Sequence, residues 1–312
     1  EFRRVLFRSN SYPTLMRERA GKATKVRELV FSSELMGLHV GKTRAVYTEF
    51  LPDKRYLFKD YSDLVLLDLA SGMKKRLTSH ERLYNPSLNE QETKIIATEF
   101  KEDQTWAIAE FDLSGKRLQS FALPDSKIAE VRYIDNDSAV ALLSNKIGQK
   151  SIVIVDLREK KIVKTMVAPS RNLLNALYVD KNKNLLFEAQ YKGHNEIFRI
   201  NPDGIARCTA TKLGAYTPSS DGVNLYYSNM DTYGSTIQST PLSSCEKFDS
   251  AQLVDFKYLG NTPSDNYNSF PLQAFPEQDS LFTKNAEHYQ PKPYGDFDTQ
   301  LLRSEEHTSE LQ

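Results

Sequence analysis

A unit of roughly 40 to 45 residues recurs along most of this 312-residue chain and constrains its fold more than any other feature. Each copy contains an apolar strand, a turn, a second strand that ends in an aliphatic-Asp step, a tight turn and a short last strand. Equivalent points fall near Thr78, Phe121, Met166, Thr209 and Asp249, so the spacings are 43, 45, 43 and 40 residues. Such a period is typical of four-stranded propeller blades.

The local sequence favours strands within each copy. Short runs of Ile, Val, Leu, Phe and Tyr, such as those in residues 94–97 and 106–113, are bounded by Gly, Asp, Asn, Ser or Pro. Pairs such as Ser114-Gly115 supply the positive φ of tight hairpins. Radial packing buries the faces of such small sheets and leaves only short edges. We therefore predict an all-β protein, a β-propeller over residues 41–249 with five visible blades and six in the intact protein.

The two ends of the chain encode the same DNA read on opposite strands. Back-translation of residues 1–9, followed by reverse complementation, yields the peptide at residues 303–311. We interpret residues 1–9 and 303–312 as adapter-derived and leave them out of the fold reasoning. Residues 10–302 are then expected to be a fragment of a larger protein.

Two segments flank the predicted propeller. We expect residues 10–40 to be a partial blade or a linker, with a helix over residues 15–35 that Gly21 interrupts. Residues 250–302 are rich in Pro, Asn and aromatic residues, and only residues 252–259 resemble a strand. We predict that this tail is a strap or linker, because its aromatic content favours docking over disorder.

Composition excludes several classes of function. The 41 basic and 41 acidic residues give a net charge of zero, which leaves no electrostatic footprint for nucleic acid or an anionic membrane. A hydrophobic content of 39% suits a globular chain, and no apolar run approaches the ~18 residues of a membrane span. We expect no nucleic-acid partner, no membrane insertion by this fragment, and a monomer.

The repeat resembles the TolB-like, or WD40-like, periplasmic β-propellers. Their Pro-x-Phe-Ser-Pro-Asp-Gly-type turn is similar to Pro218-Ser219-Ser220-Asp221-Gly222 and to residues 85–89, and their Ile-Tyr-x-Asp-Leu-x-Thr-Gly-type hairpin is similar to residues 67–72, 111–115 and 155–157. The resemblance covers residues 45–249 and implies a periplasmic or cell-envelope location. Residues 214–218 and 225–228 resemble a subgroup in which the propeller lies between a metallopeptidase-like domain and an outer-membrane-type barrel.

Motifs that carry chemistry are few. Gly41-Lys42-Thr43 is similar to the end of a phosphate loop, but the first glycine of that loop would fall on Met36, and we interpret the segment as a turn. The sequence contains no Gly-x-Ser-x-Gly elbow and no His-Glu-x-x-His motif. We therefore predict no catalytic residue, no cofactor-binding residue, no metal ligand and no cofactor in this fragment.

The remaining candidates are scattered polar residues. His39, His80, His194 and His288 each lack a second histidine or cysteine at ligand spacing. His194 lies in a predicted rim loop, where a histidine is most often solvated and only sometimes binds a ligand. Asp221, Gly222, Asn224 and Asp231 lack the spacing of a calcium loop and are interpreted as turn residues.

The two cysteines occupy nearly the same position in successive copies. Cys208 and Cys245 each lie near the last strand of a blade. A periplasmic location, which the resemblance implies, would permit a disulfide. Outer strands of adjacent blades usually exceed the ~4.4 to 6.8 Å Cα separation that a disulfide needs, so we predict two free thiols.

Two classes of function stay open. In the first, the propeller is a non-catalytic scaffold whose rim loops or channel mouth bind a protein or peptide, within a larger cell-envelope protein that supplies neighbouring domains. In the second, it is a substrate-gating accessory domain of a peptidase whose catalytic domain lies outside this fragment. The absence of a catalytic constellation favours the first.

Overall fold

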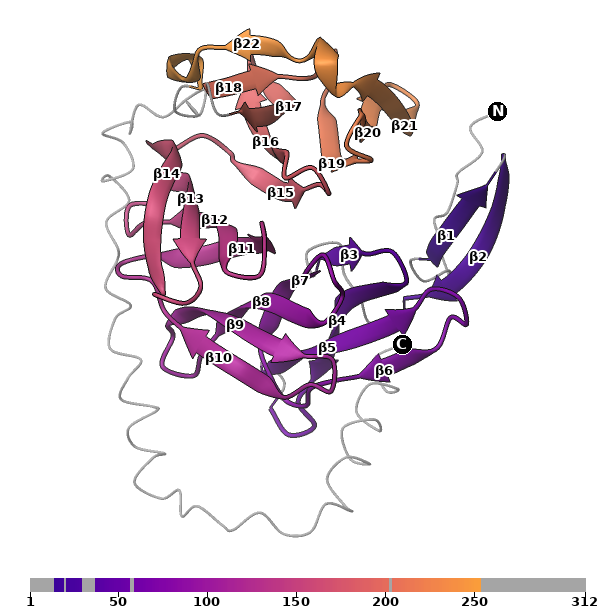
Figure 1. The fold of residues 1–312 in the computed structure, drawn as a ribbon, viewed down its shortest axis with the longest axis vertical. Coiled ribbons are helices and arrows are strands. Elements are labelled where there is room, and N and C mark those ends of the chain that lie inside the picture. Colours follow the sequence, from indigo (N-terminus) through magenta and orange to yellow (C-terminus); the bar gives the residue numbers. More distant parts are fainter. Residues whose placement is uncertain (1–13, 20, 30–36, 57–58, 202–203, 254–312) are drawn as a thin grey trace, which may run out of the picture. The chain divides into compact units, whose positions relative to one another are not determined.

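The computed structural model describes residues 14–19, 21–29, 37–56, 59–201 and 204–253 (Figure 1). The chain divides into two compact units, residues 1–256 and 257–312, and all described residues belong to the first. The tail from residue 254 onward, with His288 and most of the predicted strap, lies outside the described residues. Residues 250–253, which begin that tail, form the 3₁₀ turn η3 (Ser250–Gln252) and the buried Leu253.

Five antiparallel sheets follow one another along the chain as the blades of a β-propeller, which confirms the predicted fold class (Figure 1). Blade 1 contains β3 (Leu38–Val40), β4 (Arg44–Pro52), β5 (Asp60–Asp68) and β6 (Lys74–Arg76). Blade 2 contains β7 (Leu83–Leu88), β8 (Lys94–Phe100), β9 (Trp106–Asp112) and β10 (Arg117–Phe121). Blade 3 contains β11 (Lys127–Tyr133), β12 (Ser138–Ser144), β13 (Lys150–Asp156) and β14 (Lys161–Ser170).

The last two blades differ from the first three in their number of strands. Blade 4 contains β15 (Asn175–Val179), β16 (Leu185–Tyr191), β17 (His194–Asn201) and β18 (Gly204–Arg207). Blade 5 contains β19 (Ala215–Ser220), β20 (Asn224–Asp231) and β21 (Gly234–Pro241). The next strand, β22 (Glu246–Phe248), pairs with β18 and makes blade 4 five-stranded, so blade 5 has three strands among the described residues.

The hydrophobic core is divided among the interfaces between neighbouring blades. Ile96 and Ile108 of blade 2 pack with Ile128 and Val131 of blade 3, and similar clusters lie between the other successive blades. Middle strands such as β8 and β12 are buried on both faces, which explains why they are continuous apolar runs in the sequence. This burial between blades holds the first strand of each blade in place around a common axis.

The segment predicted as a helix is a β-hairpin, so that prediction was wrong. β1 (Thr14–Arg19) pairs with β2 (Lys22–Glu28), and Gly21 at φ +75° forms the turn between them. Leu15, Val26 and Leu29 pack on the buried side chains of blade 1. The helix-favouring residues of this segment are overruled by that packing, since a hairpin lays alternate side chains on one apolar face.

The prediction of two free thiols was also wrong, because Cys208 and Cys245 form a disulfide with a Cα separation of 4.1 Å. The prediction assumed that Cys245 begins an outer strand of blade 5. The chain instead turns through η2 (Leu242–Ser244) and adds β22 to the outer edge of blade 4. Cys245 therefore lies beside Cys208, which follows β18 directly.

Candidate functional site

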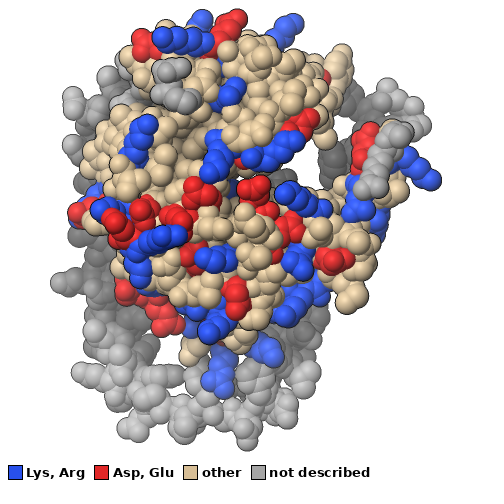
Figure 2. Space-filling model, in the orientation of Figure 1, with Lys and Arg blue, Asp and Glu red and all other residues tan. Residues whose placement is uncertain are grey.

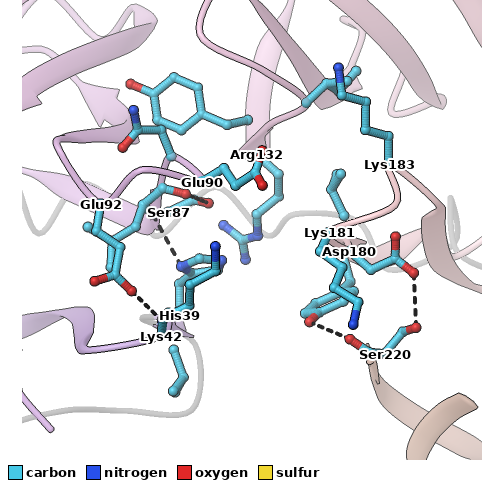
Figure 3. Close-up of a pocket in the computed structure, with 18 residues that line it drawn as sticks. His39, Lys42, Ser87, Glu90, Glu92, Arg132, Asp180, Lys181, Lys183 and Ser220 are labelled. Atoms are coloured by element: carbon cyan, nitrogen blue, oxygen red, sulfur yellow. Dashed lines mark hydrogen bonds between the residues drawn. The ribbon is translucent and has the colours of Figure 1, made fainter. Parts of the chain in front are cut away.

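The first strands of all five blades line one cavity of about 280 Å³. Each blade contributes polar or aromatic residues, and His39, Ser87, Arg132, Tyr178 and Ser220 represent blades 1 to 5 in order. Figure 3 shows the Arg132 guanidinium between the side chain of His39 on one side and the side chains of Asp180 and Ser220 on the other. We call this cavity the axial mouth.

Irregular backbone in the first strands creates hydrogen-bonding groups near the axis. The register shifts within β7, β11, β15 and β19, and Ala176 and Thr217 have positive φ at such shifts. Carboxylates of the preceding blade accept the backbone N–H groups exposed there: Glu130 accepts from Ala176 at 2.8 Å, and Glu188 accepts from Thr217 at 2.5 Å. Burial, with the nearby Glu130 charge, raises the pKa of Glu188. These contacts join successive blades.

Arg132 joins three blades at the floor of the axial mouth. Its Nη1 donates to the Asn85 carbonyl at 2.7 Å and to the Val131 carbonyl at 3.1 Å, and its Nε donates to the Leu177 carbonyl at 3.1 Å. Its Nη2 lies 3.6 Å from the Glu130 carboxylate. The guanidinium is thus held by backbone oxygens of blades 2, 3 and 4, and its charge is partly offset by Glu130.

His39 is a neutral side chain in the wall of the axial mouth. Its Nδ1 accepts the backbone N–H of Leu88 at 3.2 Å, which requires the tautomer with the proton on Nε2. Burial, with the Arg132 charge, lowers the pKa of His39 to about 4, although Glu92 acts in the opposite direction. Among the described histidines His39, His80 and His194, only His39 lines this cavity.

The segment Gly41-Lys42-Thr43 binds an anion, but that anion is part of the protein. Glu92 accepts the backbone N–H groups of Lys42 and Thr43 and the Thr43 hydroxyl. Burial acts to raise the pKa of Glu92, but these hydrogen bonds outweigh it and hold the pKa below its ordinary value. A Cβ at Gly41 would overlap the Glu92 carboxylate, so a larger residue there would require the carboxylate to move.

Charged groups of both signs surround the rim of the axial mouth. Lys42, Glu90, Lys181 and Lys183 line it, and Lys183 also lies 3.5 Å from the Asp135 carboxylate. Figure 2 shows Lys and Arg intermixed with Asp and Glu over the visible face. The mouth therefore offers donors and acceptors in close proximity, which suits a ligand with several polar groups.

The other sequence candidates lie apart from the axial mouth or form turns. His80 packs edge-on against Tyr61 with ring centroids 4.6 Å apart, and His194 hydrogen-bonds to Glu196 at 2.9 Å as the first residue of β17. Asp221 accepts the backbone N–H groups of residues 223 and 224, and Asp231 accepts that of residue 233. In the described part of the chain, no group of three or more His, Cys, Asp or Glu residues is arranged to hold a metal ion.

Sequence reasoning missed Arg132, Glu130 and Glu92. Glu130 and Arg132 lie in the predicted strand of residues 127–133, where they are charged residues between apolar ones. That interruption is the signal that could have found them, because a charged side chain in a buried strand usually has a specific partner.

Within the described residues, no helix is long and apolar enough to span a membrane.

Comparisons with known proteins show the fold. No family model matches the chain, and no curated protein matches its sequence. TolB from Acinetobacter baumannii is similar in structure with a TM-score of 0.55 at 16% identity over 73% of this chain, which spans 57% of the length of that protein. A TolB structure from Agrobacterium tumefaciens matches with a TM-score of 0.55 at 13% identity, covering 71% of this chain and 81% of that one.

A hydrolase is also similar in structure. Puromycin hydrolase matches with a TM-score of 0.51 at 10% identity, over 74% of this chain and 40% of that chain. Identities this low establish a common fold and leave function to the residues of the site. The chain thus contains a five-bladed β-propeller that is structurally similar to TolB and to a propeller-containing hydrolase.

Proposed function

We propose that this chain is a non-catalytic β-propeller scaffold that binds a protein or peptide segment at the axial mouth, as one module of a larger cell-envelope protein. The supporting observation is the convergence of the first strands of all five blades on one polar cavity. Its volume of about 280 Å³ suits a few residues of a peptide. Binding sites commonly lie on such loops and strand ends because a rigid scaffold positions them.

The chemistry of the rim favours a polar peptide segment. Lys42 and Lys181 present ammonium groups for carboxylate or carbonyl oxygens, while Glu90 can accept backbone or side-chain donors. Arg132 and Glu92 are already engaged by the protein and are assigned to holding the mouth in shape. We therefore propose that the exposed side chains of the rim bind the peptide, while Arg132 and Glu92 hold the cavity in shape.

A cell-envelope location is part of the proposal. The Cys208–Cys245 disulfide supports it, because structural disulfides persist in oxidising compartments such as the bacterial periplasm. The similarity to TolB structures points the same way.

The second candidate function is a substrate gate for a peptidase. It is supported by the structural similarity to puromycin hydrolase, of which this chain covers 40%. The uninterrupted reading frame distinguishes the two candidates. A His-Glu-x-x-His motif upstream or a Gly-x-Ser-x-Gly elbow downstream would favour the gate.

Peptide selection tests the proposal directly. A random heptapeptide phage library is selected on the immobilised chain, and enriched peptides are titrated by fluorescence anisotropy. We expect Lys42→Glu/Lys181→Glu to weaken binding at least tenfold, since it reverses two charges at the rim. The matched control Lys54→Glu/Lys164→Glu changes two lysines elsewhere and should bind as the parent does. Peptides that bind both double variants with parent affinity would disprove the axial mouth as the site.

A further inference from the structure

The outer edge of blade 5 is uncovered in the described part of the chain. β21 is the last strand of the three-stranded order β19-β20-β21, whereas blades 1 to 3 each have a fourth strand. One edge of β21 therefore presents backbone N–H and C=O groups that have no strand beside them there. Such an edge is a template for strand addition.

The strand that would cover β21 is held elsewhere. Four residues separate β21 from β22, which is also the number that separates β9 from β10 and β13 from β14. β22 therefore has the sequence position of a fourth strand of blade 5, but it pairs with β18 of blade 4. The Cys208–Cys245 disulfide and the contact of Phe248 with Phe198, at 5.0 Å between ring centroids, hold it there.

The edge at β21 also lacks the charges that protect the other edges. The outermost strands of the other four blades all contain charged residues, namely β6 with Lys74, Lys75 and Arg76, β10 with Arg117, β14 with Lys161 and Lys164, and β22 with Glu246 and Lys247. β21 reads Gly-Ser-Thr-Ile-Gln-Ser-Thr-Pro and contains none. Charged side chains on an edge strand normally hinder edge-to-edge association, and β21 is the one of these five edge strands that has none.

Apolar side chains accompany the open edge. Ile237 in the middle of β21 is 85% exposed, and the register places it opposite Ser228, on the same face as Tyr226 and Met230. Both of these residues are also exposed. Figure 2 shows mostly uncharged side chains over the strands of blade 5. Exposed apolar groups beside an open strand edge mark an interaction surface.

We propose that β21 pairs antiparallel with β21 of a second copy of this chain, about a twofold axis near Ile237. In antiparallel self-pairing about a twofold axis, the residue on the axis faces its own copy, and residues equally far on either side of it face each other. None of these facing pairs in β21 contains a charge, so none is repulsive. At β6, which consists of Lys74, Lys75 and Arg76, the same symmetry would bring cationic side chains together. Each copy would supply the fourth strand of the other copy's blade 5. This proposal departs from the monomer expected from the sequence.

Sedimentation velocity of the full chain over a range of concentrations tests the proposal. We expect a concentration-dependent dimer in the parent and a monomer in Ile237→Lys, because two lysines would then face each other across the axis. The matched control Ile147→Lys introduces the same charge at an exposed hairpin of blade 3, where Ile147 is 63% exposed, and should dimerise as the parent does. Circular dichroism and thermal unfolding confirm that each variant is folded.

Hydrogen exchange provides a second measurement that does not depend on a variant. Amides of residues 235–239 should exchange several-fold more slowly at high protein concentration than at low concentration, while those of β10 should not change. A chain that stays monomeric at all concentrations would overturn the proposal. This holds whether the β21 amides exchange freely or are protected by another segment of the same chain. A dimer that persists in Ile237→Lys would also overturn it.

Discussion

The Glu92 carboxylate of blade 2 accepts the backbone N–H of Thr43 of blade 1 at 3.0 Å. The same carboxylate accepts the Thr43 hydroxyl, so a short turn of one blade encloses an anion of the next. A phosphate loop also uses backbone N–H groups to bind an anion, which there is a ligand. Here the anion belongs to the protein, and the contact stabilises the junction between two blades.

We expect Glu92→Gln to lower the free energy of unfolding by about 1 to 2 kcal/mol at pH 7, because a neutral amide replaces a charged acceptor. The pKa of Glu92 is lowered in the folded protein, so its contribution is present above the ordinary value of 4.5 and is lost as pH falls through the folded pKa. Urea unfolding of parent and variant from pH 7 to pH 3.5 should therefore show a difference that shrinks in acid. Glu90→Gln, at an exposed neighbour, is the control, and a pH-independent difference would contradict the assignment.

His39 should make the protein acid-sensitive. Its pKa of about 4 lies below the ordinary 6.5, so the unfolded chain binds its proton first and stability falls as pH drops from 6.5 to 4. We expect a loss of roughly 3 kcal/mol across that window. His39→Asn keeps an acceptor for the Leu88 N–H and should remove the loss. An NMR titration of the His39 ring with a midpoint near 6.5 would refute this account.

We expect Arg132 to contribute mainly to the stability of the fold, because its guanidinium binds backbone carbonyls of three blades. Arg132→Met leaves the carbonyls of three blades without their donor, and we expect unfolding to become easier by about 3 kcal/mol. Arg158→Met is the control, since that side chain pairs with Asp137 at 2.6 Å in an exposed position, where ion pairs contribute about 0 to 1 kcal/mol. Equal effects of the two substitutions in urea unfolding would count against the role of Arg132.

The disulfide should stabilise blade 4 and blade 5 together. Its cysteines are 37 residues apart, and chain-entropy arguments give about 4 kcal/mol for a loop of that length. Cys208→Ser/Cys245→Ser should therefore lower the unfolding free energy by up to that amount and speed hydrogen exchange in β22. A thiol titration of denatured, unreduced protein should find no free thiol, and the appearance of two would contradict the disulfide.

Local sequence was sufficient for most of the architecture. β8 and β9 appear in the sequence as apolar runs separated by polar residues, and Ser114-Gly115 forms the predicted turn to β10. Each of these features lies within a few residues along the chain. The period of the repeat then indicated how many sheets there are and that they form a propeller.

The partners of residues near the axis could not be found in this way. Arg132 is held by carbonyls 47 and 45 residues distant, at Asn85 and Leu177, so its role depends on three blades at once. Glu92 likewise acts on a turn 49 residues away. No local pattern reports such contacts, because they exist only when the blades are packed around the axis.

The repeated pattern of apolar strands and turns by itself determined an all-β propeller, since burial of small sheets against one another is encoded in every copy. Only the tertiary structure decided that residues 14–28 form a hairpin, that β22 joins blade 4, and that Cys208 meets Cys245. These outcomes depend on which apolar faces and strand edges remain uncovered once the blades have packed. Which faces and edges are covered depends on contacts between distant segments, so no short stretch of sequence can predict it.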